Sequence, residues 1–448
     1  MTASASVASG PVASPWRRHG LLLLLTLLYT DNFIGRQVLA VMIGPIQREF
    51  GVGDTAMGLV SGLAFAAVYA VFALIAGRQA DRVPRTRLLG LCALCWGLAT
   101  ILCGLSTGFV VLVLARMLVA VVEAPVTASS LSMIADLYPP RRRAFAISCF
   151  TTAPTLAAIL ALSLGAWLVE AYGWRQAFMA IGTPALGLAL LLGVLVREPR
   201  RGTWDAPTSL EIPVQSLLES VRGLWGQPAF RTLIIASAIT TLGANAYGMW
   251  NATFLVRIHG LELRQAGLLA GVIGGGSAAL GMLFSGWVTD RLVGRHPVWR
   301  LRIPQIGHLV GIVAMLAYLL WPSDARIMLG ELPVPVAMLW CGVNGFFAVW
   351  WVGPVLSHIT HLVAPDARAT ALAIQTVAVT VFGVGLGPLA IGAISDLLSL
   401  ALGDASLRYA LLFCVLTPLI AMGFLHRVAR LEAAPKGHRE HATSRTSR

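Results

Sequence analysis

The sequence has few charged residues and almost no lysine. Only 12% of its 448 residues are charged, and Lys436 is the single lysine among 33 basic side chains, whereas about 25% of the residues in soluble proteins are charged. A soluble fold in which 57% of the residues are hydrophobic would expose large apolar patches. The composition therefore argues against a soluble enzyme and against a nucleic-acid-binding protein, although the net charge is +13.

The sequence also lacks the short motifs of enzymes and cofactor sites. It has no His-Glu-x-x-His zinc motif, no Gly-x-Ser-x-Gly nucleophile elbow and no phosphate-binding loop. All six cysteines fall in apolar runs, where they are interpreted as small packing residues. We therefore expect no enzyme activity, no metal, no cofactor and no ATP-driven step in this chain alone.

What the chain has instead is a series of long apolar runs. A transmembrane helix needs about 20 largely apolar residues, and strands of a membrane barrel would alternate in segments of about 10 residues. The sequence therefore predicts an all-α integral membrane protein with twelve transmembrane helices. The predicted spans are 20–46, 55–77, 88–106, 109–137, 144–169, 176–196, 229–256, 265–290, 301–321, 333–362, 369–394 and 407–428.

The basic residues are distributed unevenly between the predicted loops. If the N-terminus lies inside, 25 basic residues fall in inside segments and 6 in outside loops. Basic residues accumulate on the cytoplasmic side of membrane proteins, so both termini are predicted to be cytoplasmic. The excess of arginine and alanine suggests a bacterial source, and hence the bacterial inner (plasma) membrane as the location.

An internal repeat divides the chain into halves. Gly77-x-x-x-Asp81-Arg82 ends the second predicted span, and Gly286-x-x-x-Asp290-Arg291 ends the eighth. Such a parallel repeat is typical of transporters in which two bundles rock about a central site. The predicted parts are a disordered tail at 1–19, a six-helix bundle at 20–196, a cytoplasmic linker at 197–228, a six-helix bundle at 229–430 and a disordered tail at 431–448. Apolar positions in the linker are compatible with an amphipathic interfacial helix.

The motif from Gly77 to Arg87 resembles the signature between the second and third helices of the major facilitator superfamily, although Pro84 stands where that family usually has glycine. Tyr172 to Phe178 and the glycines from Gly383 to Gly387 also resemble this family. The resemblance covers essentially all of residues 20–430 and implies a fold of two six-helix bundles.

Within that family the chain is similar to the spinster-like branch. The similar runs are Asn32 to Ala40, Glu123-Ala124 and Ile134 to Arg143. The resemblance implies proton-linked export, in several members export of lysolipids or lipid mediators. It also places the arginine of the family's Asp-Arg pair on Arg36 and its aspartate on Gly35, so that this carboxylate is missing here.

Four charged residues fall well inside the predicted spans, namely Asp31, Arg36, Arg116 and Glu123. A charge at the bilayer centre costs about 2.5–3.5 kcal/mol, so each needs a polar cavity, a partner or neutralisation. Arg116 and Glu123 share a helix face but are seven residues apart, about two turns, which is too far for a direct pair along the helix. Because a desolvated carboxyl favours its protonated form, Glu123 is interpreted either as a proton carrier or as a structural partner of Arg36 or Arg116.

Asp31 lies one helical turn before Gly35, on the same helix face. It is interpreted either as the replacement for the missing carboxylate or as a polar cap of a cytoplasmic cavity. Arg36 can bind a phosphate or carboxylate through two hydrogen bonds, so it is either a ligand of an anionic head group or the counter-ion of Glu123. Arg116 is a second candidate for binding substrate.

Predicted spans seven and ten carry amides and aromatic rings but no acidic residue. Amides suit a polar head group and aromatic rings suit an apolar body, whereas interfacial or packing roles are the alternative for the tryptophans. The candidate substrate-binding residues there are Asn245, Tyr247, Trp250, Asn251, Asn344, Trp350 and Trp351.

Charged residues at the predicted cytoplasmic ends of the spans are candidates for a gate. A charge pair that forms in only one conformation shifts the equilibrium between two conformations, whereas the alternative is a static loop clamp. The candidate gating residues are Gly77, Asp81, Arg82, Arg85, Asp136, Arg143, Asp290 and Arg291.

These features predict a secondary active transporter that moves an amphipathic or anionic solute by alternating access. The first choice is a lysolipid-like solute, with proton coupling through Glu123 and with Asp31 as a second candidate. The alternative is a proton-coupled or facilitated transporter of small organic acids or drugs, and other classes are a lipid scramblase, a channel and a non-transporting sensor. The expected partners are a small-molecule or lipid-like substrate, protons and membrane lipids, with no nucleic acid, and the chain is expected to be a monomer.

Overall fold

The computed structural model describes residues 15–201, 203, 217–364 and 367–433. Most of both predicted tails and residues 204–216 of the predicted linker lie outside the described residues, so their disorder and its extent stay predictions. The first helix, α1, begins at Pro15 and the last, α20, ends at Ala433. Within the predicted linker, helix α10 spans Leu217–Trp225.

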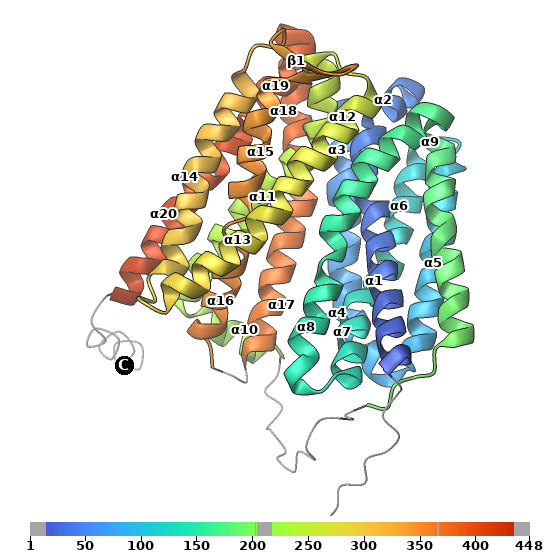
Figure 1. Cartoon of the computed structure of the whole chain (residues 1–448), viewed down its shortest axis with the longest axis vertical. Helices are drawn as coiled ribbons and strands as arrows, with labels where there is room; N and C mark the ends of the chain where they lie inside the picture. The colour runs from blue at the N-terminus through green and yellow to red at the C-terminus, as the bar shows by residue number, and fades with distance from the viewer. Residues whose placement is uncertain (1–14, 202, 204–216, 365–366, 434–448) are drawn as a thin grey trace, which may run out of the picture. The chain divides into compact units, whose positions relative to one another are not determined.

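The described part of the first half of the chain is helical (Figure 1). Its elements are α1 (Pro15–Gln37), α2 (Leu39–Phe50), α3 (Asp54–Gly58), the π-helical segment η1 (Leu59–Leu63), α4 (Ala64–Arg82), α5 (Arg85–Gly104), α6 (Phe109–Glu123), α7 (Val126–Leu137), α8 (Pro140–Thr151) and α9 (Ala153–Leu195).

The second half adds a short antiparallel hairpin to its helices. Strands β1 (Arg326–Leu329) and β2 (Leu332–Pro335) pair with Arg326 opposite Pro335. The helical elements are α10, α11 (Pro228–His259), α12 (Leu263–Leu269), η2 (Ala270–Gly275), α13 (Gly276–Val293), α14 (Trp299–Leu320), α15 (Ala337–Ala348), α16 (Val352–Leu362), α17 (Arg368–Ala378), η4 (Val379–Leu386), α18 (Gly387–Leu402), η5 (Gly403–Ala405), α19 (Ser406–Leu411) and α20 (Phe413–Ala433).

Nine helical stretches in the described part of the chain are long and apolar enough to cross a membrane. Two of them, Phe145–Leu195 and Thr370–Ala433, have 51 and 64 residues, and each can therefore hold two crossings of about 20 residues. The predicted first span, 20–46, is covered by α1 and α2 but is not among the nine. The predicted all-helical architecture is confirmed.

The long helix α9 contains a sharp break at Gly173. Its φ of 84° and ψ of 160° lie in a region that residues with a side chain rarely adopt. The break falls between the predicted spans 144–169 and 176–196. The glycine therefore supplies the turn between two membrane crossings.

Contacts divide the chain into two compact units. Unit 1 comprises Met1–Arg36, Val71–Ala157 and Arg175–Glu211, and unit 2 comprises Gln37–Ala70, Ala158–Trp174 and Ile212–Arg448. The divisions at 36/37, 70/71, 157/158 and 174/175 fall in helices of the first half, so unit 2 contains parts of both halves of the sequence. The bundle boundaries at 20–196 and 229–430 stay a prediction.

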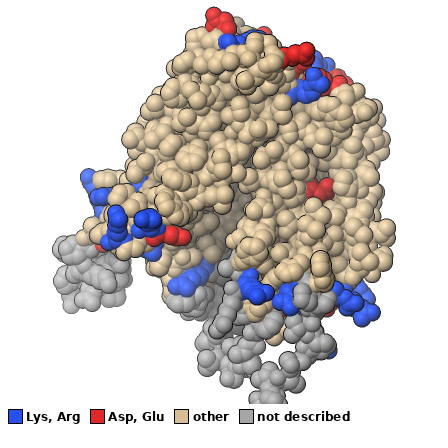
Figure 2. All heavy atoms as spheres, in the orientation of Figure 1, with Lys and Arg blue, Asp and Glu red and all other residues tan. Residues whose placement is uncertain are grey.

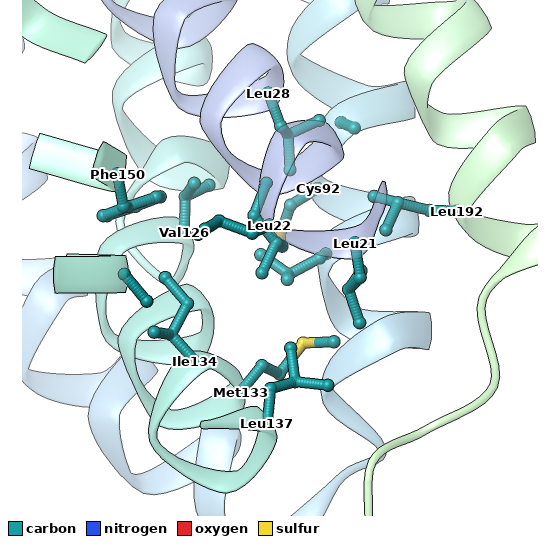
Figure 3. Close-up of a cluster of buried hydrophobic side chains, with 14 of the residues drawn as sticks. Leu21, Leu22, Leu28, Cys92, Val126, Met133, Ile134, Leu137, Phe150 and Leu192 are labelled. Atoms are coloured by element: carbon teal, nitrogen blue, oxygen red, sulfur yellow. The ribbon is translucent and has the colours of Figure 1, made fainter. Parts of the chain in front are cut away.

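The core of unit 1 is formed by apolar side chains from α1, α5, α7, α8 and α9 (Figure 3). Leu21, Leu22 and Leu28 of α1 lie among Cys92 of α5 and Met133 of α7 in this cluster. These side chains come from the apolar runs of the sequence, and their burial holds α1 in the position from which its polar residues are presented.

Unit 2 has a separate apolar core between α10, α11, α14, α16, α17 and α20. Helices α14 and α20 lie side by side in it (Figure 1). On the face shown in Figure 2, neutral residues cover the sides of the helices, and most described charged side chains gather near helix ends. This distribution suits helices whose sides face lipid.

Candidate functional site

Arg36 and Glu123 form a buried ion pair in unit 1. Arg36 Nε donates a hydrogen bond to Glu123 Oε2 over 2.7 Å. The side chain of Glu123 is 1% exposed and that of Arg36 is 19% exposed, and the Arg36 guanidinium also lies 4.8 Å from the ring centre of Phe33. Arg36 lies near the end of α1, and Glu123 is the last residue of α6. The structure therefore brings together Glu123 and Arg36, which the sequence analysis named as one of its possible counter-ions.

Arg116 approaches the same turn of α1 from α6. Its Nη1 donates to the backbone oxygen of Gly35 over 2.9 Å, and its side chain is buried. A Cβ atom added to Gly35 would meet no atom within 4 Å. Gly35 therefore leaves open space beside the turn of α1 that carries Arg36 and that Arg116 contacts.

Asp31 has a different kind of partner. Its Oδ2 accepts a hydrogen bond over 3.1 Å from Nε1 of Trp96, a buried residue of α5. None of the described ion pairs includes Asp31. Next to it, Asn32 is buried, and neither its side-chain nitrogen nor its oxygen has a hydrogen-bond partner among the described residues. The polar residues of α1 thus contact both the indole of Trp96 and the charged side chains of α6.

Arg85, predicted as a gating residue, is buried at the start of α5 with an acceptor at each end of its guanidinium. Nη1 donates to Asp136 Oδ2 over 2.5 Å, and Nε donates to Glu198 Oε1 over 2.8 Å. Nη1 also contacts Ser132, and Nη2 donates to the backbone oxygen of Pro199 over 3.0 Å. The structure therefore joins two predicted gating residues to the start of the predicted linker.

Glu198 anchors the linker to the first turn of α5. It accepts hydrogen bonds from the Thr86 backbone nitrogen over 2.8 Å and from Thr86 Oγ1 over 2.9 Å. Burial alone would raise the pKa of Glu198, but these hydrogen bonds and the bond from Arg85 outweigh it and hold the pKa below its ordinary value of 4.5.

The other predicted gating residues are less well defined. The surroundings of Gly77, Asp81 and Arg82 lie outside what the structure describes, although α4 extends through these positions. Arg143 lies in α8. Asp290 and Arg291 are exposed at the end of α13, where the Arg291 guanidinium lies 5.6 Å from the Trp287 ring centre.

The predicted substrate-binding residues of the second half separate into two groups. Asn245 and Tyr247 are half-buried on α11; Asn245 Nδ2 donates to the Thr241 backbone oxygen over 3.1 Å, and Tyr247 Oη lies 3.2 Å from Cys341 Sγ. The other five are buried. They are Trp250, Asn251, Asn344, Trp350 and Trp351.

Two of the buried residues have satisfied hydrogen bonds within unit 2. Trp250 Nε1 donates to the Pro388 backbone oxygen over 3.0 Å, and Asn251 Oδ1 accepts from Tyr318 Oη over 2.6 Å. Trp350 lies against Phe347, with ring centres 4.7 Å apart. Trp351 belongs to the apolar core of unit 2. These contacts agree with the packing interpretation of the tryptophans, and a role of these residues in substrate binding stays a prediction.

Sequence reasoning missed Trp96, Glu198 and a polar cluster around Asp54 in unit 2. The sequence argument considered charges inside the predicted spans and at their predicted cytoplasmic ends, whereas Asp54 lies just before the span 55–77, at its predicted outer end. Trp96 lies in an apolar run, where an indole is ordinarily a packing residue. Glu198 was visible only as part of a polar linker, since nothing in the sequence indicates its contact with Thr86.

The sequence and the fold were compared with known proteins. A family model described as Major Facilitator Superfamily matches residues 25–388. The chain is 30% identical over 404 residues to an MFS-type efflux pump of Mycolicibacterium smegmatis, and the alignment covers 90% of each protein. It is 28% identical over 406 residues to the sphingosine-1-phosphate transporter SPNS2 of Danio rerio, and this alignment covers 86% of this chain and 78% of that protein.

A solved structure is similar over nearly the whole fold. It is that of a bacterial homolog to the human lysosomal transporter spinster, in an inward-facing and unoccupied conformation. The TM-score is 0.82 at 27% sequence identity, over 94% of this chain and 98% of that one. The likeness in sequence and the likeness in fold therefore extend over the same helices.

Proposed function

The chain belongs to the major facilitator superfamily and is a spinster-like secondary transporter of a small-molecule substrate, and we propose that it moves a lysolipid-like anion by alternating access coupled to protons. The predicted all-helical membrane fold of that superfamily is confirmed, as is the expectation of a multi-pass membrane protein that is a transporter rather than an enzyme.

The observation that carries the proposal is the Arg36–Glu123 ion pair. Glu123 is almost without contact with solvent, whereas Arg36 is partly exposed. When Glu123 takes up a proton, it no longer neutralises the arginine, and the cost of leaving Arg36 without an anion favours binding of a phosphate or carboxylate head group in its place. Proton binding and substrate binding are thereby linked through one guanidinium.

Asp31 is the second proposed proton site. It lies on the same helix as Arg36 and is paired with the neutral Trp96 donor rather than with an arginine. A buried carboxylate held by a neutral donor retains much of its desolvation cost and takes up a proton more readily than one paired with a cation. Asn32 offers further polar atoms in this region of α1.

The anionic and amphipathic class of substrate rests on Arg36, Arg116 and the half-buried Asn245 and Tyr247. One relative is a sphingosine-1-phosphate transporter, and sphingosine-1-phosphate is a molecule of this class. The main alternative is a small organic acid or a drug. A scramblase or channel would need no titrating carboxyl, and a sensor would not move the solute.

Liposome transport separates these possibilities. The purified protein is reconstituted, and uptake of a radiolabelled lysophospholipid, an organic acid and a cationic drug is measured with and without an imposed pH gradient. We expect accumulation of the lysophospholipid only with the gradient, and its loss in Glu123→Gln. The matched control is Glu170→Gln, which removes an exposed carboxylate.

The outcomes are distinct. Equilibration without accumulation means a facilitator, channel or scramblase, and accumulation of only the drug or the acid replaces the substrate class. Accumulation that persists in Glu123→Gln removes this residue from the coupling. The proposed orientation, with both termini in the cytoplasm of a bacterial inner membrane, rests on the arginine bias and is tested by reporter fusions at the two ends. The proposed monomeric state is tested by the mass of the detergent-solubilised protein.

A further inference from the structure

A cavity of about 300 Å³ lies in unit 2 where α14 begins and where α16 and α20 end. Each of these three helices belongs to a stretch that is long and apolar enough to cross a membrane. The cavity is therefore placed at the level of a membrane surface, and none of the residues assigned above to transport lines it. Its polar lining residues are His296, Arg300, His358, His361 and Glu432.

Arg300 lines the cavity from the first turn of α14. Its Nη2 donates a hydrogen bond to His361 Nε2 over 2.8 Å, whereas its buried Nε has no hydrogen-bond partner among the described residues. A histidine nitrogen that accepts a hydrogen bond carries no proton, so the proton of the His361 ring is on Nδ1. Arg300 therefore supplies a permanent positive charge with an unused donor, and His361 supplies a second donor.

His358 lines the cavity from the last turns of α16. Its side chain is 7% exposed, and its Nε2 lies 3.1 Å from Glu432 Oε1. Even so, neither ring nitrogen makes a hydrogen bond to a described residue. Because a buried polar group without a hydrogen bond is unfavourable, a ligand oxygen that accepts from this ring would stabilise the site.

Three histidines and one carboxylate in a single cavity raise the alternative of a metal site. Among the described residues, however, no group of three or more His, Cys, Asp or Glu side chains is placed to hold a metal ion. The surrounding charge favours an anion instead, since residues 295–302, 357–368 and 426–433 contain six arginines and two acidic residues. Figure 2 shows several basic side chains at the lower left, where α20 ends in Figure 1. The positive end of the α14 helix dipole also lies at the cavity, because α14 begins there.

An apolar path leads from the cavity along α14. Val298 lines the cavity and precedes the exposed Arg302 by one helical turn. The Arg302 guanidinium lies 5.8 Å from the ring centre of Trp299, a residue type that is frequent at membrane–water interfaces. From there, apolar side chains that are 36–57% exposed recur every three or four residues on the same face of α14, at Ile306, Leu309, Val313, Leu316 and Leu320. The site thus has a basic end and an apolar continuation, as an amphipathic ligand requires.

We propose that this cavity, here called the Arg300 pocket, binds the phosphate of an anionic diacyl phospholipid whose acyl chains lie along the exposed face of α14. Basic pockets between membrane helices bind such head groups in other proteins. A phosphodiester carries one negative charge for Arg300 and offers oxygens that accept from the arginine and from the His358 ring. The inference does not rest on the proposed function, because the ligand is a membrane lipid held in place rather than a transported solute.

Native mass spectrometry of the full-length, detergent-solubilised protein tests the pocket. Dioleoyl phosphatidylglycerol, which is anionic, is titrated alongside dioleoyl phosphatidylcholine, which has the same chains and a zwitterionic head group. We expect the wild type to bind phosphatidylglycerol more tightly. In Arg300→Gln its apparent affinity should fall by roughly tenfold, or about 1.4 kcal/mol, while binding of phosphatidylcholine stays unchanged. Arg300→Lys keeps the charge but loses the fork of donors, so its affinity should lie between the two.

Arg264 supplies the matched control. It lies at the start of the apolar stretch Leu263–Val293, whereas the Arg300 pocket follows the end of that stretch, so the two arginines belong to opposite membrane surfaces. Its side chain is 56% exposed, and its Nε lies 4.0 Å from Glu170 Oε1. Exposed pairs of this kind contribute little to stability. Arg264→Gln therefore removes one positive charge away from the pocket and should bind phosphatidylglycerol as the wild type does.

Equal affinity of the wild type for the two lipids would overturn the proposal. So would an Arg300→Gln variant that binds phosphatidylglycerol as tightly as Arg264→Gln does. Inorganic phosphate separates the two sources of the phosphate group: if it displaces phosphatidylglycerol when added at the same concentration, the pocket recognises the free ion and the assignment to a lipid is wrong. If Arg300→Gln does not fold, the comparison of Arg300→Lys with Arg264→Lys decides in the same way.

Discussion

Replacing Arg36 should make the stability of this protein depend on pH through one buried carboxyl. In the wild type the guanidinium lies 2.7 Å from Glu123, whose side chain is 1% exposed. In Arg36→Gln the Glu123 carboxylate loses the positive charge that pairs with it. A buried carboxylate without an adequate partner avoids most of its desolvation cost by taking up a proton. The native variant then holds one proton more than its unfolded chain.

The size and the sign follow from the proton balance. A glutamate in water has a pKa of about 4.3, and one pH unit corresponds to about 1.36 kcal/mol. Protonating Glu123 on folding therefore costs up to about 3.7 kcal/mol at pH 7 and about 1.6 kcal/mol at pH 5.5. The variant should thus become more stable as the pH falls.

Thermal unfolding of detergent-solubilised protein at several pH values measures this effect. The double variant Arg36→Gln/Glu123→Gln has no carboxyl at this position, so it should lose the extra pH dependence and be more stable near pH 7 than Arg36→Gln. Arg264→Gln, which breaks an exposed pair, controls for the loss of one positive charge. The reasoning is refuted if the single and double variants show the same change of midpoint with pH.

Three further predictions concern other parts of the chain. Glu198→Gln should free the start of the linker and speed tryptic cleavage after Arg200 and Arg201. Because the pKa of Glu198 is lowered from 4.5, the contacts of Glu198 in the wild type should hold above pH 4.5 and weaken as the pH falls further. Hydrogen–deuterium exchange of residues 197–201 would show this weakening. Gly35→Asp should fold normally, since an added Cβ meets no atom within 4 Å, and should broaden the pH dependence of transport, whereas a loss of expression would contradict the open space. Gly281→Ala should cost about 1–3 kcal/mol, because its Cβ would overlap the Phe346 backbone oxygen, while Gly286→Ala on the same helix, with nothing within 4 Å, should be neutral or slightly stabilising in the same unfolding assay.

The helices and the buried charges could be predicted because both depend on local sequence. An apolar run of sufficient length has few alternatives to a membrane helix, and a charge within it demands a partner wherever the helix packs. That demand made Arg36 a candidate partner of Glu123. Arg85 and Asp136 were both named as charged residues at the ends of predicted spans, but the pattern did not pair them with each other.

Contacts that depend on the facing of a helix could not be read from the pattern. Trp250 and Tyr247 are three residues apart on α11, yet one is buried against Pro388 and the other is half-buried. A tryptophan is equally suited to packing and to ligand contact, so only the tertiary structure separates the two roles. Asp54 was overlooked for another reason: its partners at residues 257 and 395 are far away in the chain, and no short motif marks them.

The polar cluster around Asp54 joins residues that are far apart in the chain: its side chain accepts hydrogen bonds from Arg257 and Ser395, and its backbone nitrogen donates to Asp396. This wide spacing has a consequence for synthesis. Ribosomes add about 5–20 residues per second, and Asp54 precedes Arg257 by 203 residues and Asp396 by 342. Asp54 therefore leaves the ribosome about 10–40 s before its arginine and about 17–70 s before the carboxylate that caps its helix. Until Arg257 emerges, Gln47 is the only one of these partners that accompanies Asp54. The nascent first half must carry an incompletely paired acid near the membrane for most of the time that the second half takes to emerge.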